Sequence, residues 1–600
     1  MKGIAIGLSN NSKEILKRLK KNEFVKDIYI ASSSKEDGKE NQLIQVQKPK
    51  KILLKKWQEI DLIIFIGSIA ASIRIINSFL TSKDQDPGVI VIDNKCSKIV
   101  PLIGLHQSNT QNIAFQIASL LGGEIIETNN SNDKRFLNLD AFGNQWGWKK
   151  SGNIKDWSKL VIKQAKNEEI FCKQLSGNRL WKNSESGEII NQINEKEIEK
   201  PNSIFHVSIF ENHETTWHPP VLWIGIGCER NTSKELIANS LNNLLESRNL
   251  SKYSIAGLAT VDIKKEEKGI LELAEEKNLP IKFFSKEDLS TIIVPNPSIV
   301  VEKEIGTPSV AEASCLIAAG EESKLLEEKR IFKNQSGAVT IAIAESKNQY
   351  NPTHGEIHII GSGPGDISFL TSNAKKALSR CTVWIGYKMY LDLIKSLKRN
   401  DQVLIESKLT EEKERCSKAI KLAEEGIKVA LISSGESGFY GMAGLVLELL
   451  QKIKKEYRPY FEVHPGISSV QLAAAISGAP LMNDFCSVSL SDKLTPWSLI
   501  KKRIEGALVG DFVIALFNPQ SIERNWQLKS VIDICLQTRH GDTPVLIARQ
   551  VGRENQTKKF FTLKTVPFKE IDMLSIIIIG NSQTTLIDEI FLTPRGYLQD

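Results

Sequence analysis

Closely spaced cysteines are absent from this 600-residue sequence. A disulfide framework, a cysteine zinc site and a cysteine-bound iron–sulfur segment all use cysteines at short, paired spacings. The cysteines here stand far apart, at positions Cys96, Cys172, Cys228, Cys315, Cys381, Cys416, Cys486 and Cys535. Their dispersion argues against all three classes. His206, His213 and His218 fit neither an i,i+4 pair nor a zinc-finger pattern, so we predict no metal site.

Long apolar runs are also scarce. The apolar run before Ser9 has only six residues, which is too short for the core of a signal peptide. The stretch 62–73 is too short to span a bilayer and is followed by Arg74. We therefore expect a cytoplasmic protein without a membrane partner.

A strong charge of one sign is missing as well. The formal net charge is +7, and the basic residues, mostly lysines, are scattered. No block is dense enough to predict a nucleic-acid partner, although a modest positive balance suits an anionic substrate. The length and a hydrophobic content of 41% are typical of a soluble chain of about three to five domains.

What the sequence does have is a glycine-rich turn after a buried strand. The predicted strand 357–360 runs into alternate glycines, Gly361, Gly363 and Gly365, before a predicted helix at 371–380. Such glycines let the backbone turn sharply and approach a ligand closely. A dinucleotide fingerprint is disfavoured, because Asp366 replaces its third glycine and Pro364 removes an N–H group. A purely structural turn is the alternative.

The N-terminal half alternates apolar runs with helical patterns, which predicts α/β units. Residues 1–145 form the first unit, with predicted strands at 3–8, 27–31, 61–66 and 88–93 and helices at 12–21 and 107–121. Polar clusters predict a linker region at 146–218. A second α/β unit follows at 219–346, with Thr232 as a helix cap, strands at 254–260, 280–284, 298–302 and 338–343, and helices at 266–277 and 310–319.

Four segments of this half resemble the cobalt-precorrin-5A hydrolase family of cobalamin biosynthesis: 101–121, 225–228, 262–267 and 306–313. The resemblance implies a lactone-opening hydrolase with His106 as a catalytic residue, although His106 also fits a polar loop histidine. Ser108 and Asn109 stand where the family has glycines, and Gln111 stands where it has asparagine. These departures favour the alternative, a non-catalytic binding or scaffolding module for corrin intermediates.

The C-terminal part, 356–600, has two further glycine-rich loops after predicted strands. They lie at 433–443 and 463–469, and the predicted strands are 382–385, 428–432, 461–463, 512–517, 544–548 and 573–579. Loops at the carboxyl ends of strands are where open α/β sheets bind ligands. We expect two α/β subdomains with a boundary near 465–470, forming an autonomous cofactor-binding unit after the polar linker 346–355.

Residues 356–600 resemble the tetrapyrrole methyltransferase family, and in particular precorrin-3B C(17)-methyltransferases, through the segments 481–486, 489–497, 517–521, 580–582 and 593–597. The resemblance implies S-adenosylmethionine as cofactor and methylation of a tetrapyrrole at C-17 with ring contraction, with a homodimer as one open possibility. It places the cofactor against Pro364, Gly435, Glu436, Ser437, Gly438, Ser468 and Ser469. Glu436 and Ser437 stand where the family has aspartate and proline.

Ring contraction needs proton movement, for which a carboxylate near the macrocycle is suited. Asp366 is the first candidate and Asp492 the second; each could instead be an aspartate that caps its own loop. The tetrapyrrole carries carboxylates, which arginine matches with two parallel hydrogen bonds. The candidate substrate-binding residues are Arg503, Arg524, Arg549, Arg553 and Arg595.

Overall fold

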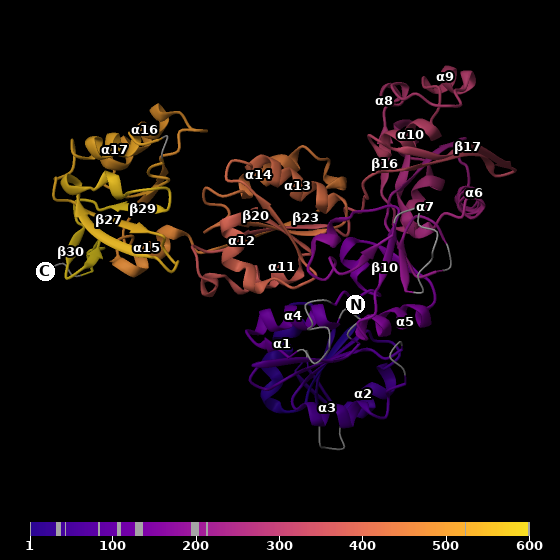
Figure 1. Ribbon diagram of the computed structural model, residues 1–600, viewed down its shortest axis with the longest axis horizontal. Coiled ribbons are helices and arrows are strands. Elements are labelled where there is room, and N and C mark those ends of the chain that lie inside the picture. The colour runs from indigo at the N-terminus through magenta and orange to yellow at the C-terminus, as the bar shows by residue number, and fades with distance from the viewer. Residues whose placement is uncertain are drawn as a thin grey trace.

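The computed structural model describes residues 2–31, 38–41, 44–81, 85–104, 110–126, 136–193, 203–211, 214–521 and 524–597. They form successive α/β units. Figure 1 shows the unit of residues 356–464 in the middle, with the C-terminal subdomain on one side and the N-terminal half on the other. In the part of the chain that the structure describes, every helix is too short or too polar to cross a bilayer.

The first unit is an eight-stranded sheet with the order β3-β4-β2-β1-β5-β6-β7-β8. Its strands are β1 (Gly3–Gly7), β2 (Asp27–Ala31), β3 (Gly38–Asn41), β4 (Ile44–Gln47), β5 (Leu62–Ile66), β6 (Gly88–Ile92), β7 (Lys98–Ile103) and β8 (Glu124–Ile125). The helices are α1 (Lys13–Lys21), α2 (Pro49–Lys56), α3 (Ile69–Ile76) and α4 (Thr110–Leu121). The four predicted strands and both predicted helices are confirmed, the helix at 107–121 over its described part, 110–121, because buried apolar runs and 3.6-residue periodicity are local signals. His106 lies outside the described residues.

The predicted linker at 146–218 is wrong, because its described residues, 146–193, 203–211 and 214–218, fold into a second unit. It is a five-stranded sheet, β11-β10-β12-β13-β9, accompanied by α5 (Ile154–Ala165). The strands are β9 (Lys149–Ser151), β10 (Phe171–Gln174), β11 (Asn191–Gln192), β12 (Ile204–Val207) and β13 (Thr216–His218). Polar composition hid a core built from a few large rings that are separated by polar stretches: Trp146, Trp148, Trp157, Trp181 and Trp217.

The third unit is the sheet β16-β15-β14-β18-β17. Its strands are β14 (Leu222–Cys228), β15 (Ile255–Val261), β16 (Ile281–Phe284), β17 (Lys324–Asn334) and β18 (Gly337–Glu345), and its helices are α6 (Lys234–Ser247), α7 (Lys268–Lys277), α8 (Lys286–Ser290), α9 (Ile299–Ile305) and α10 (Ala311–Ala319). The predicted strand 298–302 is wrong: Ser298 caps α9 by accepting from Val301 N–H at 3.4 Å. The predicted cap Thr232 is also wrong, because Ser233 caps α6.

The middle unit is an all-parallel sheet with the order β21-β20-β22-β19-β23. Its strands are β19 (Glu356–Gly361), β20 (Val383–Tyr387), β21 (Val403–Ser407), β22 (Lys428–Ser433) and β23 (Tyr460–His464), and its helices are α11 (Ser372–Arg380), α12 (Lys388–Ile394), α13 (Glu412–Glu424) and α14 (Ala443–Gln451). Helices cover both faces, as parallel strands require. Thr371 begins α11 by accepting from Ala374 N–H at 3.2 Å.

The C-terminal subdomain contains the sheet β25-β26-β29-β27-β28 and the small sheet β24-β31-β30. Its strands are β24 (Gly478–Ala479), β25 (Phe485–Ser489), β26 (Val513–Phe517), β27 (Pro544–Arg549), β28 (Thr557–Thr562), β29 (Ser575–Ile579), β30 (Thr585–Ile587) and β31 (Ile590–Leu592). The helices are α15 (Ser469–Ser477), α16 (Trp497–Val509) and α17 (Gln527–Cys535). The buried face of α15 packs mainly on the five-stranded sheet β25-β26-β29-β27-β28, through Val470 and Ala473. The chain therefore enters this subdomain directly after β23.

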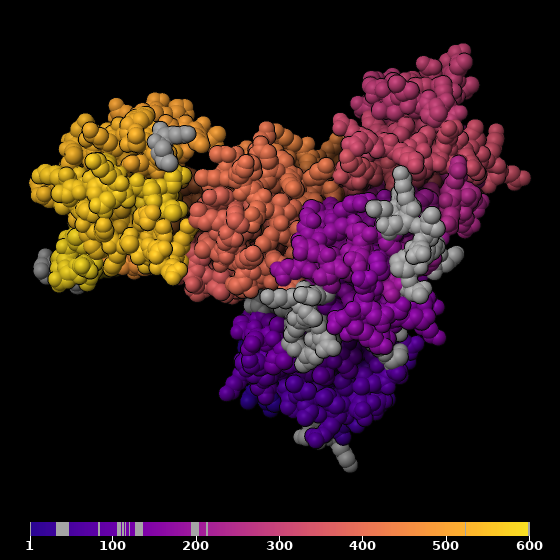
Figure 2. Space-filling model, in the orientation of Figure 1, coloured from indigo at the N-terminus to yellow at the C-terminus, as the bar shows by residue number. Residues whose placement is uncertain are grey.

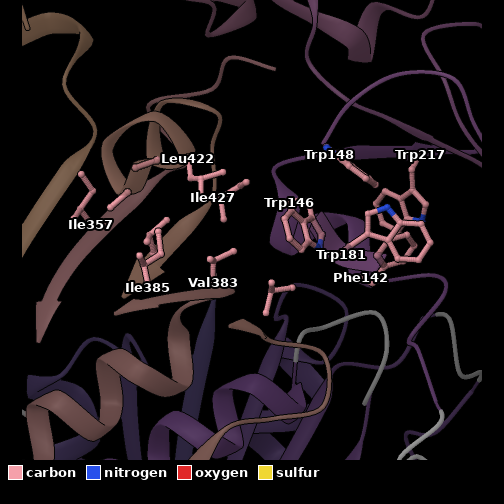
Figure 3. Packing of buried hydrophobic residues seen from close by; sticks show 14 of the residues in the cluster. Phe142, Trp146, Trp148, Trp181, Trp217, Ile357, Val383, Ile385, Leu422 and Ile427 are labelled. Atoms are coloured by element: carbon pink, nitrogen blue, oxygen red, sulfur yellow. The ribbon is translucent and has the colours of Figure 1, made fainter. Parts of the chain in front are cut away.

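We call the second unit, whose described residues lie within 136–218, the tryptophan unit. One hydrophobic core runs from it into the middle unit. Figure 3 shows Trp146 between the other tryptophans and the aliphatic side chains of Val383 and Ile427. Polar contacts reinforce it: Gln145 Nε2 donates to Asp401 Oδ2 at 2.7 Å. Val383 opens β20, Asp401 precedes β21 and Ile427 precedes β22. The N-terminal half therefore covers the amino ends of the middle sheet and leaves its carboxyl ends open to a different neighbour.

Candidate functional site

Three loops converge at the carboxyl ends of neighbouring strands. They follow β19, β22 and β23, which lie side by side in the middle sheet. Gly363 N–H donates to Gly435 O at 3.1 Å, and Gly435 N–H donates back to Gly363 O at 2.8 Å. These reciprocal bonds join the first two loops in an isolated bridge. The prediction that separate glycine-rich loops form one constellation therefore has a geometric basis.

Glycine is required where these loops touch. A Cβ atom on Gly466 would lie 2.1 Å from Gly435 O, and one on Gly361 would lie 2.6 Å from Gly466 N. Gly435 itself has a φ of +65°, the left-handed region that glycine adopts without strain. A side chain at Gly361 or Gly466 would push the loops apart, and one at Gly435 would strain its backbone.

Glu436 ties the second loop to the third. One carboxylate oxygen accepts from Gly438 N–H at 2.9 Å, and the other accepts from Gly466 N–H at 2.6 Å. Both oxygens are thus engaged with backbone donors. The side chain fixes the loop positions, whereas the sequence alone suggested direct contact with a cofactor.

The second subdomain closes on the first loop. Asp366 N–H donates to Gly552 O at 2.7 Å, and Arg553 Nε donates to Pro364 O at 3.4 Å. Figure 2 shows the two subdomains meeting along a narrow boundary. The first loop, at 361–366, therefore lies where the two α/β subdomains join.

Comparison with known families decides what this arrangement is. Residues 356–567 match the family described as Tetrapyrrole (Corrin/Porphyrin) Methylases. A probable cobalt-factor III C(17)-methyltransferase of Salmonella typhimurium (strain LT2) is 43% identical over 241 residues, which cover 40% of this chain and 99% of that protein. The chain belongs to the tetrapyrrole methylase family.

Two further relatives align with the methylase part. A cobalt-factor III methyltransferase of Priestia megaterium is 44% identical over 245 residues, or 40% of this chain, and the chain spans only 45% of that relative's length. A precorrin-3B C(17)-methyltransferase of Sinorhizobium is 33% identical over 249 residues, covering 40% of this chain and 97% of that protein. The expected resemblance of the C-terminal part is confirmed.

The N-terminal half matches two models of a second family. Residues 51–132 match Cobalamin synthesis G N-terminal, and residues 222–344 match Cobalamin synthesis G C-terminus. The protein is thus a tetrapyrrole methylase joined to domains of another cobalamin-synthesis family. The tryptophan unit at 136–218 lies between the two matched ranges and outside both.

S-adenosylmethionine is the methyl donor of the methylase family, and the residues at the loops fit it. Ser437 Oγ is buried and has no hydrogen-bond partner among the described residues. From Gly435, a Cβ would meet only the backbone of 467–469, at 3.8 Å or more. Ser468 caps α15 and Ser469 is its first residue. The unpaired Ser437 hydroxyl and the open backbone at Gly435 therefore suit an uncharged polar edge of S-adenosylmethionine.

The predicted carboxylates have different surroundings. Asp366 is exposed and caps a short turn, accepting from Ser368 N–H at 2.7 Å. Hydrogen bonds from the Ser368 side chain and backbone lower the pKa of Asp366. Asp492 lies after β25 in the second subdomain, where it accepts from Gln527 Nε2 at 2.9 Å. The structure therefore favours the capping interpretation for Asp366.

The five predicted arginines do not form one cluster. Arg553 lies against the first loop, whereas Arg549 is paired with Asp572 at 2.7 Å. Arg524 is buried and donates to Asn518 O at 2.8 Å. Arg503 and Arg595 are exposed. Arg553 is the candidate that its contacts place nearest the cofactor loops.

Sequence reasoning missed a buried polar group beneath the third loop. His358 Nε2 lies 2.8 Å from Glu356 Oε2, and His358 Nδ1 lies 2.9 Å from His464 Nε2. Although burial opposes it, the hydrogen bond from His358 together with Lys428 lowers the pKa of Glu356 to about 2. Burial, followed by the neighbouring His358, lowers the pKa of His464 to about 4. The available signal was a Glu-x-His pattern on two strands, 356–358 and 462–464.

Proposed function

We propose that the C-terminal part transfers a methyl group from S-adenosylmethionine to C-17 of a precorrin-3-type tetrapyrrole, with contraction of the ring, in cobalamin biosynthesis. The observation that carries this proposal is the 43% identity to a C(17)-methyltransferase over 99% of that relative's length. The Sinorhizobium relative bears the same positional name over 97% of its length. Both alignments span nearly the whole of a single-function protein.

We further propose that the substrate already contains cobalt. Three relatives named for cobalt-factor III are 44%, 43% and 35% identical, whereas one named for precorrin-3B is 33% identical. The metal here belongs to the substrate. A macrocycle with bound cobalt needs no metal ligand from the three loops.

When bound, the cofactor supplies an electrophilic methyl group. The chain's own residues position the two reactants, which provides much of the rate enhancement in such transfers. Gly435 allows a close approach to the backbone, Gly466 lets the third loop pack against the second, and Glu436 holds these two loops together. Arg553 offers a cation at the subdomain boundary for a substrate carboxylate. Asp492 is the proposed proton acceptor, since the carboxylate of Asp366 is used as a cap.

A single-turnover assay with metal-free and cobalt-loaded substrate tests the proposal. We expect one methyl group to be transferred, and faster transfer to the cobalt-loaded form. Gly435→Val tests the cofactor site separately. A β-branched residue at φ +65° is strained, so this variant should bind S-adenosylhomocysteine more weakly. Methylation at another ring carbon would overturn the C-17 assignment, and preference for metal-free substrate would overturn the cobalt assignment.

For the N-terminal half we propose a binding or scaffolding role toward corrin intermediates. The support is the replacement of family glycines by Ser108 and Asn109, together with the core it shares with the methylase. Incubation of the full chain with a lactone-containing corrin should give binding without ring opening. Release of a two-carbon fragment at a rate that falls in His106→Ala would establish a hydrolase instead.

A further inference from the structure

Two paired strands, β19 and β23, each contribute two polar side chains to one connected group, which we call the row: Glu356, His358, Glu462 and His464. β19 and β23 run parallel, with Glu356 opposite Tyr460 and His358 opposite Glu462. Side chains two residues apart on a strand share a face of the sheet. Glu356, His358, Glu462 and His464 therefore project from the same face. Rigid strands position these groups more tightly than loops would.

The row has the spacing of a metal-ligand set. His358 Nδ1 and His464 Nε2 are 2.9 Å apart. Glu462 Oε2 lies 3.9 Å from His358 Nδ1 and 3.8 Å from His464 Nε2. One ligand atom from each residue falls within 4.8 Å of the others, so a single ion could contact all three after a small outward shift.

Glu356 supplies an independent indication, because it orients His358. Its carboxylate accepts from His358 Nε2, which places the proton on that nitrogen and leaves the Nδ1 lone pair directed at His464 and Glu462. Histidines that bind metals commonly donate their other N–H to a carboxylate in this way. Arg380 and Lys428 bind the second oxygen of Glu356, at 2.6 and 2.7 Å, and hold that carboxylate in place.

We propose that His358, His464 and Glu462 bind one divalent transition-metal ion of the zinc, nickel and cobalt class. Two imidazoles and one carboxylate match the preference of these ions, and water would complete the coordination. The Glu462 side chain is 46% exposed, whereas both histidines are buried, so the ion would enter from the Glu462 side. Binding requires the proton on His464 Nε2 to move through solvent to Nδ1 of the same ring, which frees the Nε2 lone pair for the ion with no net release of a proton.

The site lies directly below a cofactor loop. His464 ends β23, and Gly466, two residues later, donates to Glu436 of the second loop. An ion that joins β23 to β19 would anchor the start of the third loop. The role is one of positioning, separate from the methyl transfer itself.

Metal binding is tested on the full chain purified without a histidine tag and treated with a chelator. Titration calorimetry with zinc chloride should give one ion per chain, and zinc should raise the melting temperature. Glu356→Gln should weaken zinc binding by about ten- to a hundredfold, and His464→Gln should weaken it further. His540→Gln, at an exposed histidine remote from this row in the sequence, is the matched control and should leave zinc affinity unchanged.

X-ray absorption of the zinc-loaded wild-type chain gives a second readout that needs no variant to fold. We expect two imidazole ligands and oxygen in the remaining positions. Substoichiometric binding, a spectrum with one imidazole or none, or unchanged affinity in a folded His464→Gln chain would each overturn the site and leave a hydrogen-bonded histidine pair only.

Discussion

At the scale of single residues, we predict different effects on the methyl-transfer rate for substitutions of the two candidate carboxylates, Asp366 and Asp492. Asp366→Asn should lower the melting temperature slightly, because it weakens a cap, and should leave the single-turnover rate near that of the wild type. Asp492→Asn keeps an acceptor for Gln527 but removes a base, so the rate should fall by about two to four orders of magnitude. Single-turnover kinetics on both variants measures this. A slow but stable Asp366→Asn enzyme would return Asp366 to the catalytic list.

Glu425 carries a prediction about pH. Burial raises its pKa to about 7, although Asn178 Nδ2 donates to its carboxylate at 2.6 Å. The folded chain therefore binds this proton more tightly than the unfolded chain, so Glu425 costs stability as the pH rises from about 4.5 to above 7. Glu425→Gln should stabilise the chain by about 2 kcal/mol at pH 8 and by little at pH 4.5. Denaturant melts at both pH values measure the difference; equal effects would contradict it.

At the scale of elements, Glu436 connects the loop after β22 to the loop after β23. In Glu436→Gln, an amide NH₂ must face the N–H of Gly438 or Gly466, which leaves one backbone donor without an acceptor. Such a loss costs about 1–3 kcal/mol, so the Kd for S-adenosylhomocysteine should rise by about tenfold. Calorimetry measures it, with Glu436→Asp as the control that keeps the charge. Unchanged affinity in Glu436→Gln would show that the loops hold their positions without this tie.

At the scale of the whole molecule, the shared core indicates that residues 350–600 depend on the tryptophan unit for part of their stability, and the expected autonomy of this fragment stays a prediction. Cutting there would expose the aliphatic residues beside Trp146, including Val383 and Ile427. We expect fragment 350–600 to aggregate or to melt well below the full chain, whereas fragment 136–600 should keep its stability. Thermal melts of both fragments check this. Equal melting temperatures for 350–600 and the full chain would mean that the shared core adds no stability.

The sequence by itself determined the features that depend on neighbours along the chain. Buried runs such as 357–360 predicted strands, and local motifs in 356–600 indicated the methylase family. Local patterns failed where contacts are distant: the apolar start of α9 looked like a strand, and scattered tryptophans in a polar stretch looked like a linker. The apolar start of α9 is exposed, whereas the burial of the tryptophans depends on residues that sequence spacing does not bring near.

Only the tertiary structure decided how the site is assembled. The sequence supplied two Glu-x-His segments, but the sheet order placed β19 beside β23 and so brought His358 and His464 together. The order of strands likewise gathered three loops, and packing of the subdomains set Arg553 against the first of them. Pairing between strands about a hundred residues apart is a long-range choice, made by the burial of whole faces rather than by any local propensity.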